Sequence, residues 1–279
     1  FTHQYRFAAA ESVEKSYIPK ALSIIMLATI FSALLGPNIA NFNKDLINGH
    51  LYVGSYLSLA ALTSIPIIFL SFYSPKAEVI GVKEYKGRSY FELISQPRFL
   101  QAVASAAFAY AVMSFLMTAT PINMHIIEHY SLNKTGIVIQ LHIISMFLPS
   151  LITGNLLKKF GHSKIIYAGV GFYILTILLS FLETSFFNYI LSLVFLGLGW
   201  NFLYLSGTGL LVLSYKEEEK FKAQGFNDIL VFSIQALASL SAGYMLSTTS
   251  WKTMNLIAIP FLILIILSSI RADLSKGDK

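Results

Sequence analysis

The chain contains eight apolar stretches, each close to the length that crosses a lipid bilayer as a helix. Such a helix needs about 20 predominantly apolar residues. The stretches cover residues 19–40, 52–73, 99–122, 137–157, 164–182, 186–214, 226–248 and 253–270. They predict an all-α membrane protein with eight transmembrane helices, because a helix satisfies its own backbone hydrogen bonds within lipid.

The composition excludes several other classes of protein. Hydrophobic residues make up 55% of the chain and charged residues 12%, and the mean hydropathy is +0.65, which excludes an ordinary water-soluble enzyme. The sequence has no Cys, so thiolate metal sites and cysteine nucleophiles are excluded. It contains no phosphate-binding loop of the form G-x-x-x-x-G-K-[ST], so ATP-driven transport has no support. We expect no cofactor.

The basic residues lie mostly on one side of the predicted membrane. When the N-terminal segment is placed in the cytoplasm, 17 of the 20 Lys and Arg residues fall on the cytoplasmic side. Lys44, Lys134 and Lys252 fall on the other side. Cytoplasmic loops carry such an excess of basic residues. The asymmetry therefore predicts that both ends of the chain are cytoplasmic, and it explains the net charge of +6 without a nucleic-acid partner.

A short loop rich in glycine and lysine joins the fourth and fifth stretches. It reads G-N-L-L-K-K-F-G-H-S-K from Gly154 to Lys164. This resembles a cytoplasmic loop of the major facilitator superfamily of secondary transporters, of the form G-x-L-x-D-R-x-G-R-K. Gly154, Leu156, Lys159 and Gly161 match this form, and Lys164 directly follows its last position. The resemblance implies a gating role for these residues, but Lys158 stands where the family has an acid.

Other segments resemble the same family. Gly36 and Pro37 open the sequence G-P-N-I-A-N, which is similar to the family's fifth-helix Gly-Pro signature and implies a helix kink. The glycine-rich segment 197–209, residues 224–228 and the opening segment 5–10 resemble one bacterial branch of uncharacterised transporters.

The resemblance implies twelve helices in two halves of six, of which this chain would hold helices five to twelve as a fragment. We expect residues 1–73 to end the N-terminal half, 74–98 to form the cytoplasmic linker, 99–271 to form the C-terminal half and 272–279 to be a cytoplasmic tail. The expected function is secondary active transport of a small organic solute by alternating access, by a monomer in the bacterial inner membrane.

Polar and aromatic side chains inside the stretches are the candidate solute site, because such groups at membrane depth usually face a cavity or another helix. They are Tyr110, Ser114, Met117, His142, Trp200, Asn201, Tyr204 and Gln235. Trp200 and Asn201 lie near the middle of their stretch, where secondary transporters hold their solute. Alternatively, Asn201 hydrogen-bonds a neighbouring helix and the aromatic residues only pack. Leu211 is expected to point outward.

Two residues are candidates for proton coupling. Asp228 is the only carboxylate that could enter a predicted span, and His142 belongs to a residue type whose side chain ordinarily titrates near neutral pH. Asp228 could instead sit at the start of its helix and interact with the helix dipole. His142 could instead serve only as a hydrogen-bonding group between helices.

The sequence His125 to His129 spells H-x-x-E-H, the pattern of an inverted zinc-protease site. It follows Pro121 at the non-cytoplasmic edge, with no room for a protease domain, so we interpret it as a polar loop and expect no metal. The rival functions are a polytopic membrane enzyme and a channel or structural membrane protein. An enzyme would need acids or metal ligands clustered at one membrane depth, and the sequence shows scattered single groups.

Overall fold

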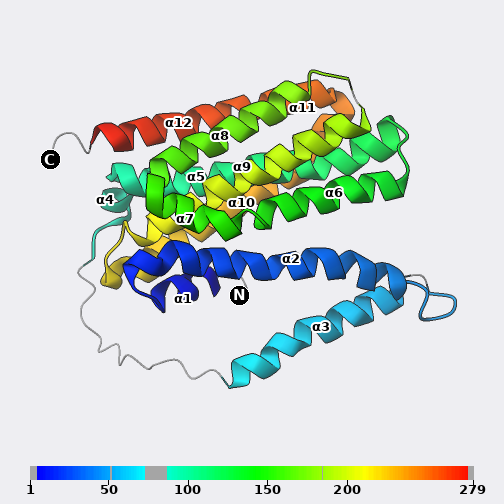
Figure 1. The fold of residues 1–279 in the computed structure, drawn as a ribbon, viewed down its shortest axis with the longest axis horizontal. Coiled ribbons are helices and arrows are strands. Elements are labelled where there is room, and N and C mark those ends of the chain that lie inside the picture. Colours follow the sequence, from blue (N-terminus) through cyan, green and yellow to red (C-terminus); the bar gives the residue numbers. More distant parts are fainter. Residues whose placement is uncertain (1–4, 51, 73–86, 184, 276–279) are drawn as a thin grey trace. The chain divides into compact units, whose positions relative to one another are not determined.

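The computed structural model of the chain is helical, with no strand in the residues that it describes (Figure 1). These are residues 5–50, 52–72, 87–183 and 185–275. The chain divides into two compact units. The larger unit comprises Phe1–Thr29 and Gly87–Lys279, and the smaller unit comprises Ile30–Lys86.

The larger unit contains the long helices of the second part of the chain. They are α5 (Pro97–Ile122), α6 (Leu132–Phe147), α7 (Ser150–Phe160), α8 (His162–Leu179), α9 (Phe186–Val212), α10 (Lys220–Thr248), α11 (Trp251–Ile257) and α12 (Ile259–Leu274). Its short helices are α1 (Tyr5–Glu11), η2 (Lys15–Tyr17), α4 (Tyr90–Ser95), η3 (Asn123–Ile127) and η4 (Glu217–Glu219). Within the described residues, six helical segments are long and apolar enough to cross a membrane, and they correspond to the last six predicted stretches.

Two of the predicted stretches are interrupted. The stretch 137–157 is divided between α6 and α7 at Pro149, and the stretch 253–270 is divided between α11 and α12 at Ala258. Pro149 immediately precedes α7, and Pro260 lies in the first turn of α12. A proline has no backbone N–H to donate to the preceding turn, so it fits the start of a new helix better than the interior of a continuous one.

Helices α5 and α9 form the centre of the larger unit. α5 packs against α9, α10 and α12, and α9 also packs against α6 and α8. Both central helices are apolar around most of their circumference, which is typical of a helix that other helices surround. Leu211 near the end of α9 is fully buried and belongs to a cluster with Phe7 and Leu93. The expectation that Leu211 points outward was therefore wrong.

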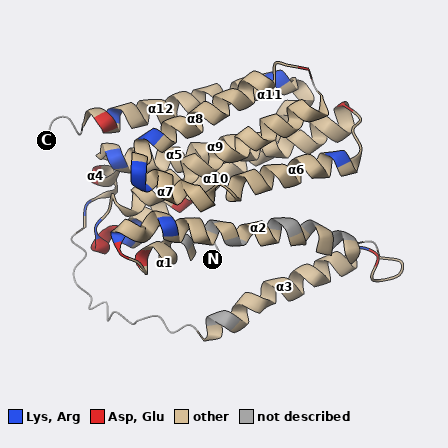
Figure 2. Ribbon diagram, in the orientation of Figure 1, with Lys and Arg blue, Asp and Glu red and all other residues tan. Residues whose placement is uncertain are grey.

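The basic residues of the larger unit gather mostly at one end of the long helices. Figure 2 shows them around α4, α7 and the start of α8, with few at the opposite ends. The same end carries the start of α10, where Lys220 and Lys222 lie. Within this unit, the arrangement agrees with the asymmetry that the sequence predicts.

The smaller unit holds the later part of α2 (Ile18–Phe42) and α3 (Val53–Ser71). In the connection between them, the Tyr52 amide donates to the Lys44 carbonyl oxygen at 2.8 Å. α2 and α3 occupy the first two predicted stretches, but neither is among the six candidate spans, and the apolar part of α3 is the shorter Val53–Ile68. The count of eight spans therefore stays a prediction.

The Gly36 and Pro37 signature lies within α2, which continues as a helix through both residues. Gly36 is exposed and a Cβ atom there would meet nothing within 4 Å. The side chain of Pro37 lies outside the described part of the structure. A kink with a packing role at this signature therefore stays a prediction.

Helical structure extends beyond both expected boundaries of the C-terminal half, residues 99 and 271. Gly87–Ser95, at the end of the expected linker, belongs to the larger unit and includes α4, while 73–86 lie outside the described residues. The expected tail begins as helix, since α12 continues to Leu274 and Ala272 is fully buried.

Candidate functional site

An aromatic cluster connects α5, α6, α9 and α10 in the larger unit. The rings of Trp200 and Tyr204, one turn apart on α9, are stacked with centroids 4.8 Å apart and planes at 17°. Tyr110 of α5 meets both rings edge-on, at 5.2 Å from Trp200 and 4.9 Å from Tyr204. Phe147 and Phe232 complete the cluster at 5.6 Å from Trp200 and 6.1 Å from Tyr110. The structure thus brings together three aromatic residues that the sequence nominates for the solute site.

The three nominated residues of this aromatic cluster are buried. Trp200 and Tyr204 are 1% and 2% exposed, and Tyr110 is 9% exposed. The Trp200 Nε1 group has no hydrogen-bond partner among the described residues. A buried N–H without a partner loses the hydrogen bond that water would supply. Trp200 therefore has a donor available to a molecule that enters between the helices.

Asn201, the residue after Trp200, is directed toward the break between α6 and α7. Its Nδ2 donates to the Met146 carbonyl oxygen and to Ser150 Oγ, each at 2.7 Å, and its Oδ1 accepts from Thr153 Oγ1 at 2.7 Å. Asn201 is 1% exposed. The amide therefore joins α9 to both helices that flank the proline break, and its participation in a solute cavity stays a proposal.

The remaining nominated residues of α5 and α10 lie near the aromatic cluster along these helices. Thr118 Oγ1 and Ser239 Oγ are hydrogen-bonded at 3.0 Å. Ser114 lies one helical turn before Thr118 on α5, and Gln235 lies one turn before Ser239 on α10. Both residues therefore lie along their helices between the hydrogen-bonded pair and the aromatic rings. Ser114 is buried, whereas Gln235 and Met117 are half-buried.

The two candidates for proton coupling lie on different helices. His142 of α6 is fully buried, and its Nδ1 lies 2.8 Å from the Leu193 carbonyl oxygen of α9. Its Nε2 has no hydrogen-bond partner among the described residues. Asp228 is buried on α10 and accepts a hydrogen bond from Asn227 Nδ2 at 3.1 Å.

The helix-start alternative for Asp228 was wrong. α10 begins at Lys220, earlier than the predicted stretch, so Asp228 lies more than two turns inside it. The helix dipole acts mainly within the first turn of a helix. Asp228 is therefore an interior carboxylate of this helix.

The predicted loop from Gly154 to Lys164 lies mostly within α7 and α8, with a sharp reversal at Gly161 between them. Gly161 joins the two helices with φ of +81°, a conformation that suits glycine. Lys159 and Lys164 are exposed beside it. Gly154 lies against the first turns of α2, where a Cβ atom would come 2.7 Å from Ser23 Oγ and 2.9 Å from the Pro19 carbonyl oxygen. The glycine thus permits α7 to contact α2 closely.

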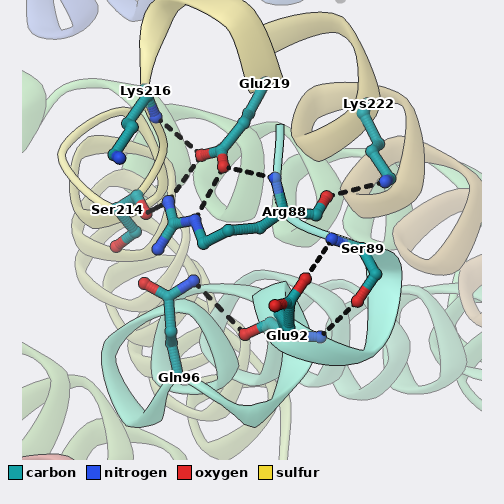
Figure 3. Close-up of polar contacts among 8 residues, drawn as sticks. All are labelled: Arg88, Ser89, Glu92, Gln96, Ser214, Lys216, Glu219 and Lys222. Carbon is teal, nitrogen blue, oxygen red and sulfur yellow. Dashed lines mark hydrogen bonds and ion pairs between the residues drawn. The ribbon is translucent and has the colours of Figure 1, made fainter. Parts of the chain in front are cut away.

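An ion pair that the sequence did not indicate lies beside the start of α10 (Figure 3). The Arg88 Nε donates to Glu219 Oε1 at 2.7 Å, and its Nη2 donates to Glu219 Oε2 at 2.5 Å. The Glu219 side chain is 1% exposed. Lys222 Nζ also donates to the Arg88 carbonyl oxygen at 2.8 Å. These contacts attach the chain before α4 to the turn before α10.

Hydrogen bonding changes the acidity of groups in this region that lie outside the predicted spans. The hydrogen bond to Glu219 raises the pKa of Arg88 above its usual value. The pKa of Glu92 is lowered, first because its carboxylate accepts a hydrogen bond from the Ser89 backbone amide. Ser89 and Glu92 form a capping box at the start of α4, so this short helix begins with its backbone donors satisfied.

A second polar network, also missed, connects the ends of α5, α8 and α12. Arg98 Nη2 donates to Asp273 Oδ1 at 3.0 Å, and Ser163 Oγ donates to the same oxygen at 2.8 Å. Arg98 Nη1 also donates to Gln101 Oε1 at 2.6 Å. The sequence shows Arg98 and Asp273 as charged residues beside predicted stretches. It could not show that they pair, because they lie 175 positions apart.

The H-x-x-E-H sequence lies at η3 and the turn after it. His125 Nδ1 lies 2.8 Å from the Tyr130 carbonyl oxygen. Among the residues that the structure describes, no group of three or more His, Asp or Glu residues could hold a metal ion.

The profile of the Major Facilitator Superfamily matches residues 6–204 and 103–276. The chain belongs to this superfamily. As a member, it is a multi-pass membrane protein and a secondary transporter of a small-molecule solute. The rival functions of a membrane enzyme and of a channel receive no support from the relatives, which are named transporters.

Relatives of this superfamily chain include characterised and uncharacterised transporters. It is 31% identical over 280 residues to the riboflavin transporter RfnT of Brucella anthropi, covering 99% of this chain and 70% of that protein. It is 29% and 28% identical to the uncharacterised transporters YddS and YdeG of Bacillus subtilis, covering 91% of this chain and 62% and 63% of theirs.

A solved structure shares the fold of this chain. A bacterial homologue of the iron transporter ferroportin, in an outward-facing state, matches with a TM-score of 0.66 and 15% identity. The match covers 97% of this chain and 67% of that one. At an identity of 15%, the similarity shows only that the two proteins share a fold.

Proposed function

We propose that this superfamily member transports a planar aromatic solute of the flavin class by alternating access. The observation that carries the proposal is the stacked pair of Trp200 and Tyr204 with Tyr110 at its edge. Aromatic rings bind flat conjugated molecules through offset stacking and edge contacts. The similarity to a riboflavin transporter over 99% of the chain supports the same class of solute.

The polar groups next to the aromatic cluster suit such a solute. A flavin ring carries carbonyl oxygens and ring nitrogens along its edge, which need hydrogen-bond partners when they leave water. Trp200 Nε1 is a buried donor without a partner among the described residues, and Ser114 and Gln235 lie one level further along α5 and α10. We propose that these groups orient the solute after the helices separate around the cluster.

We also propose the wider architecture of the transporter. Residues 1–73 would end one half, 74–98 would link the halves and 99–271 would form the second half. With both ends of the chain cytoplasmic, the eight predicted spans would be helices five to twelve of a monomer in the bacterial inner membrane. The basic residues gathered at one end of the larger unit support this orientation.

A riboflavin auxotroph without its own uptake system tests the proposed solute. The full-length protein should restore growth at low riboflavin and should take up labelled riboflavin. Trp200→Phe keeps the stacking but removes the N–H donor, so the KM should rise about tenfold, the effect of losing a hydrogen bond of about 1–1.5 kcal/mol. Phe187→Ala, at an exposed aromatic residue of the same helix, is the control. Absence of uptake, with no competition by other flavins, would overturn the proposed solute.

We further propose that uptake is coupled to protons through Asp228, with His142 as the second candidate. Both are buried within predicted spans, where an ionisable side chain usually serves transport. Asp228→Asn should abolish accumulation driven by a pH gradient but leave exchange of labelled for unlabelled solute intact. His142→Gln is tested in the same way. If both variants still accumulate solute with the gradient, coupling lies elsewhere.

A further inference from the structure

The facing sides of α5 and α10 carry aromatic rings at one level and hydroxyl groups at another. At the first level the rings of Tyr110 and Phe232 lie with their centroids 6.1 Å apart. At the second level Thr118 Oγ1 and Ser239 Oγ are hydrogen-bonded at 3.0 Å. Thr118 lies about 12 Å beyond Tyr110 along α5, because a helix rises about 1.5 Å per residue. These two contacts fix how the facing sides of the helices are aligned.

Polar side chains line both helices from just beyond the aromatic rings to the hydroxyl pair. They are Ser114 and Thr118 of α5 with Gln235 and Ser239 of α10, and we call these residues the polar seam. Residues four positions apart lie on the same face of a helix, so Ser114 shares a face with Thr118, and Gln235 shares a face with Ser239. The polar seam therefore continues directly from the aromatic cluster.

The polar seam has hydrogen-bonding capacity that the described residues do not use. Thr118 and Ser239 bond to each other, but the Ser114 hydroxyl and the Gln235 amide form no side-chain hydrogen bond within the described part of the chain. Thr118, Gln235 and Ser239 are half-buried, so a small molecule beside the helices can reach them. A polar group without a partner at membrane depth is costly. One hydrogen bond would suffice to join the two helices, so the additional polar groups indicate a binding role.

The polar seam is short and uncharged. Past its hydroxyl pair the contact between the helices becomes apolar, since a Cβ atom at Gly243 would lie 4.0 Å from Ile122 Cδ1. Residues 99–122 and 229–248 contain no Lys, Arg, Asp or Glu. Each hydroxyl and amide group of the seam can both donate and accept a hydrogen bond. This chemistry suits an uncharged chain of hydroxyl groups, whereas a phosphate group would find no cation among these segments.

We propose that the polar seam binds the hydroxylated side chain of the solute while the aromatic cluster binds its ring. This rests on the proposed function, because a riboflavin-like solute joins a flat ring to one chain of hydroxyl groups. The ring level and the hydroxyl level lie about 12 Å apart along α5, a span that such a molecule covers. The seam thereby selects a flavin with an uncharged hydroxylated chain over a flavin without the chain and over one whose chain ends in phosphate.

Competition between flavins tests which part of the solute is recognised. The uptake of labelled riboflavin by the full-length protein is measured with unlabelled riboflavin, lumiflavin or riboflavin 5′-phosphate present. Lumiflavin has a methyl group in place of the chain. Each analogue should inhibit at least about tenfold more weakly than riboflavin, because lumiflavin loses the hydrogen bonds and the phosphate is a charge without a partner. Inhibition by either analogue that equals inhibition by riboflavin would overturn the proposal.

Two substitutions locate the contact with the chain. Thr118→Val and Ser239→Ala each remove one hydroxyl, so each should raise the KM for riboflavin at least about threefold and leave the inhibition constant of lumiflavin within about twofold. Comparing two solutes on one variant cancels any loss of abundance. The controls are Thr120→Val, whose hydroxyl donates to the Leu116 carbonyl oxygen within α5, and Ser233→Ala at an exposed position of α10. Equal weakening of both flavins in the two seam variants would show packing groups and overturn the proposal.

Thiol protection gives a readout that does not depend on the transport rate. The sequence has no Cys, so Ser239→Cys in a full-length protein free of other cysteines places one thiol in the polar seam. Riboflavin well above its KM should slow maleimide labelling at least about fivefold, because the occupied protein cannot react. Lumiflavin should leave the labelling rate unchanged, and Ser233→Cys should react at one rate with either flavin. Equal protection of Ser239→Cys by both flavins would overturn the proposal.

These readouts separate the polar seam from the proposed function. Absence of riboflavin uptake by the full-length protein would overturn the proposed function itself. Riboflavin uptake that lumiflavin inhibits as strongly as riboflavin does would retain the proposed function and remove the polar seam from solute recognition.

Discussion

Gly154 of α7 and Pro19 of α2 approach so closely that a side chain at position 154 has no space between them. A Cβ atom there would lie 2.9 Å from the Pro19 carbonyl oxygen and 2.7 Å from Ser23 Oγ. The glycine that the sequence shares with the family's loop therefore has a packing role in this protein. A side chain in place of the glycine hydrogen at position 154 would change the separation of α7 and α2.

We expect Gly154→Val to force α7 away from α2 and reduce transport. Added atoms in a packed contact cost about 1–3 kcal/mol, which corresponds to a shift of about fivefold to 150-fold in a conformational equilibrium. Uptake per molecule of full-length protein is the measurement. Gly171→Val is the matched control, because a Cβ atom at Gly171 of α8 would meet nothing within 4 Å. Equal uptake by the two variants would contradict the role of Gly154.

Replacing Asn201 with Ala should destabilise the contact between α9 and the α6–α7 break. The change removes hydrogen bonds to Met146, Ser150 and Thr153, and losing such buried bonds costs about 1–3 kcal/mol. Thermal unfolding in detergent measures this loss. Asn188→Ala, which removes one hydrogen bond near the start of the same helix, is the control.

The same Asn201→Ala variant tests the proposed cavity role. If Asn201 also contributes to solute binding, uptake per folded molecule should fall well beyond the loss of abundance. Normal uptake per molecule would leave Asn201 as a packing group alone and remove it from the solute site.

Glu219→Ala should destabilise the larger unit, because it leaves the Arg88 guanidinium without its partner. Removing one partner of a buried ion pair costs about 3–5 kcal/mol of stability. Because the Arg88 side chain is 29% exposed and water can solvate it, we expect a loss at or below the lower end of that range. The melting temperature is the measurement. Glu217→Ala, at a carboxylate side chain that is 68% exposed, should change stability by less than about 0.5 kcal/mol. Equal melting temperatures for both variants would show that the ion pair contributes little.

The predicted topology can be tested by labelling single cysteines with a membrane-impermeant reagent. Cysteines replacing Lys44, Lys134 and Lys252 should react from one side of the membrane. Cysteines replacing Lys86, Lys159 and Lys220 should react from the other. Labelling of both sets from the same side would show that the orientation is wrong.

The sequence alone determined which segments of the larger unit are long apolar helices and to which family the chain belongs. A membrane helix depends on a local property, the length of an apolar stretch, so six predicted stretches have counterparts in α5 to α12. The loop around Gly161 was equally readable, because a positive φ at a tight reversal requires a glycine locally.

The tertiary structure decided which side of each helix is buried and which distant residues meet. Residues that face lipid and residues that face other helices are both apolar, so the sequence could not show that Leu211 is buried against Phe7. Nor could it show that Asn201 would meet the break at Pro149. Arg88 and Glu219 lie 131 positions apart, and only the packing of α4 against the start of α10 joins them. Helix formation in a membrane is a local consequence of hydropathy, whereas partner choice depends on packing between helices.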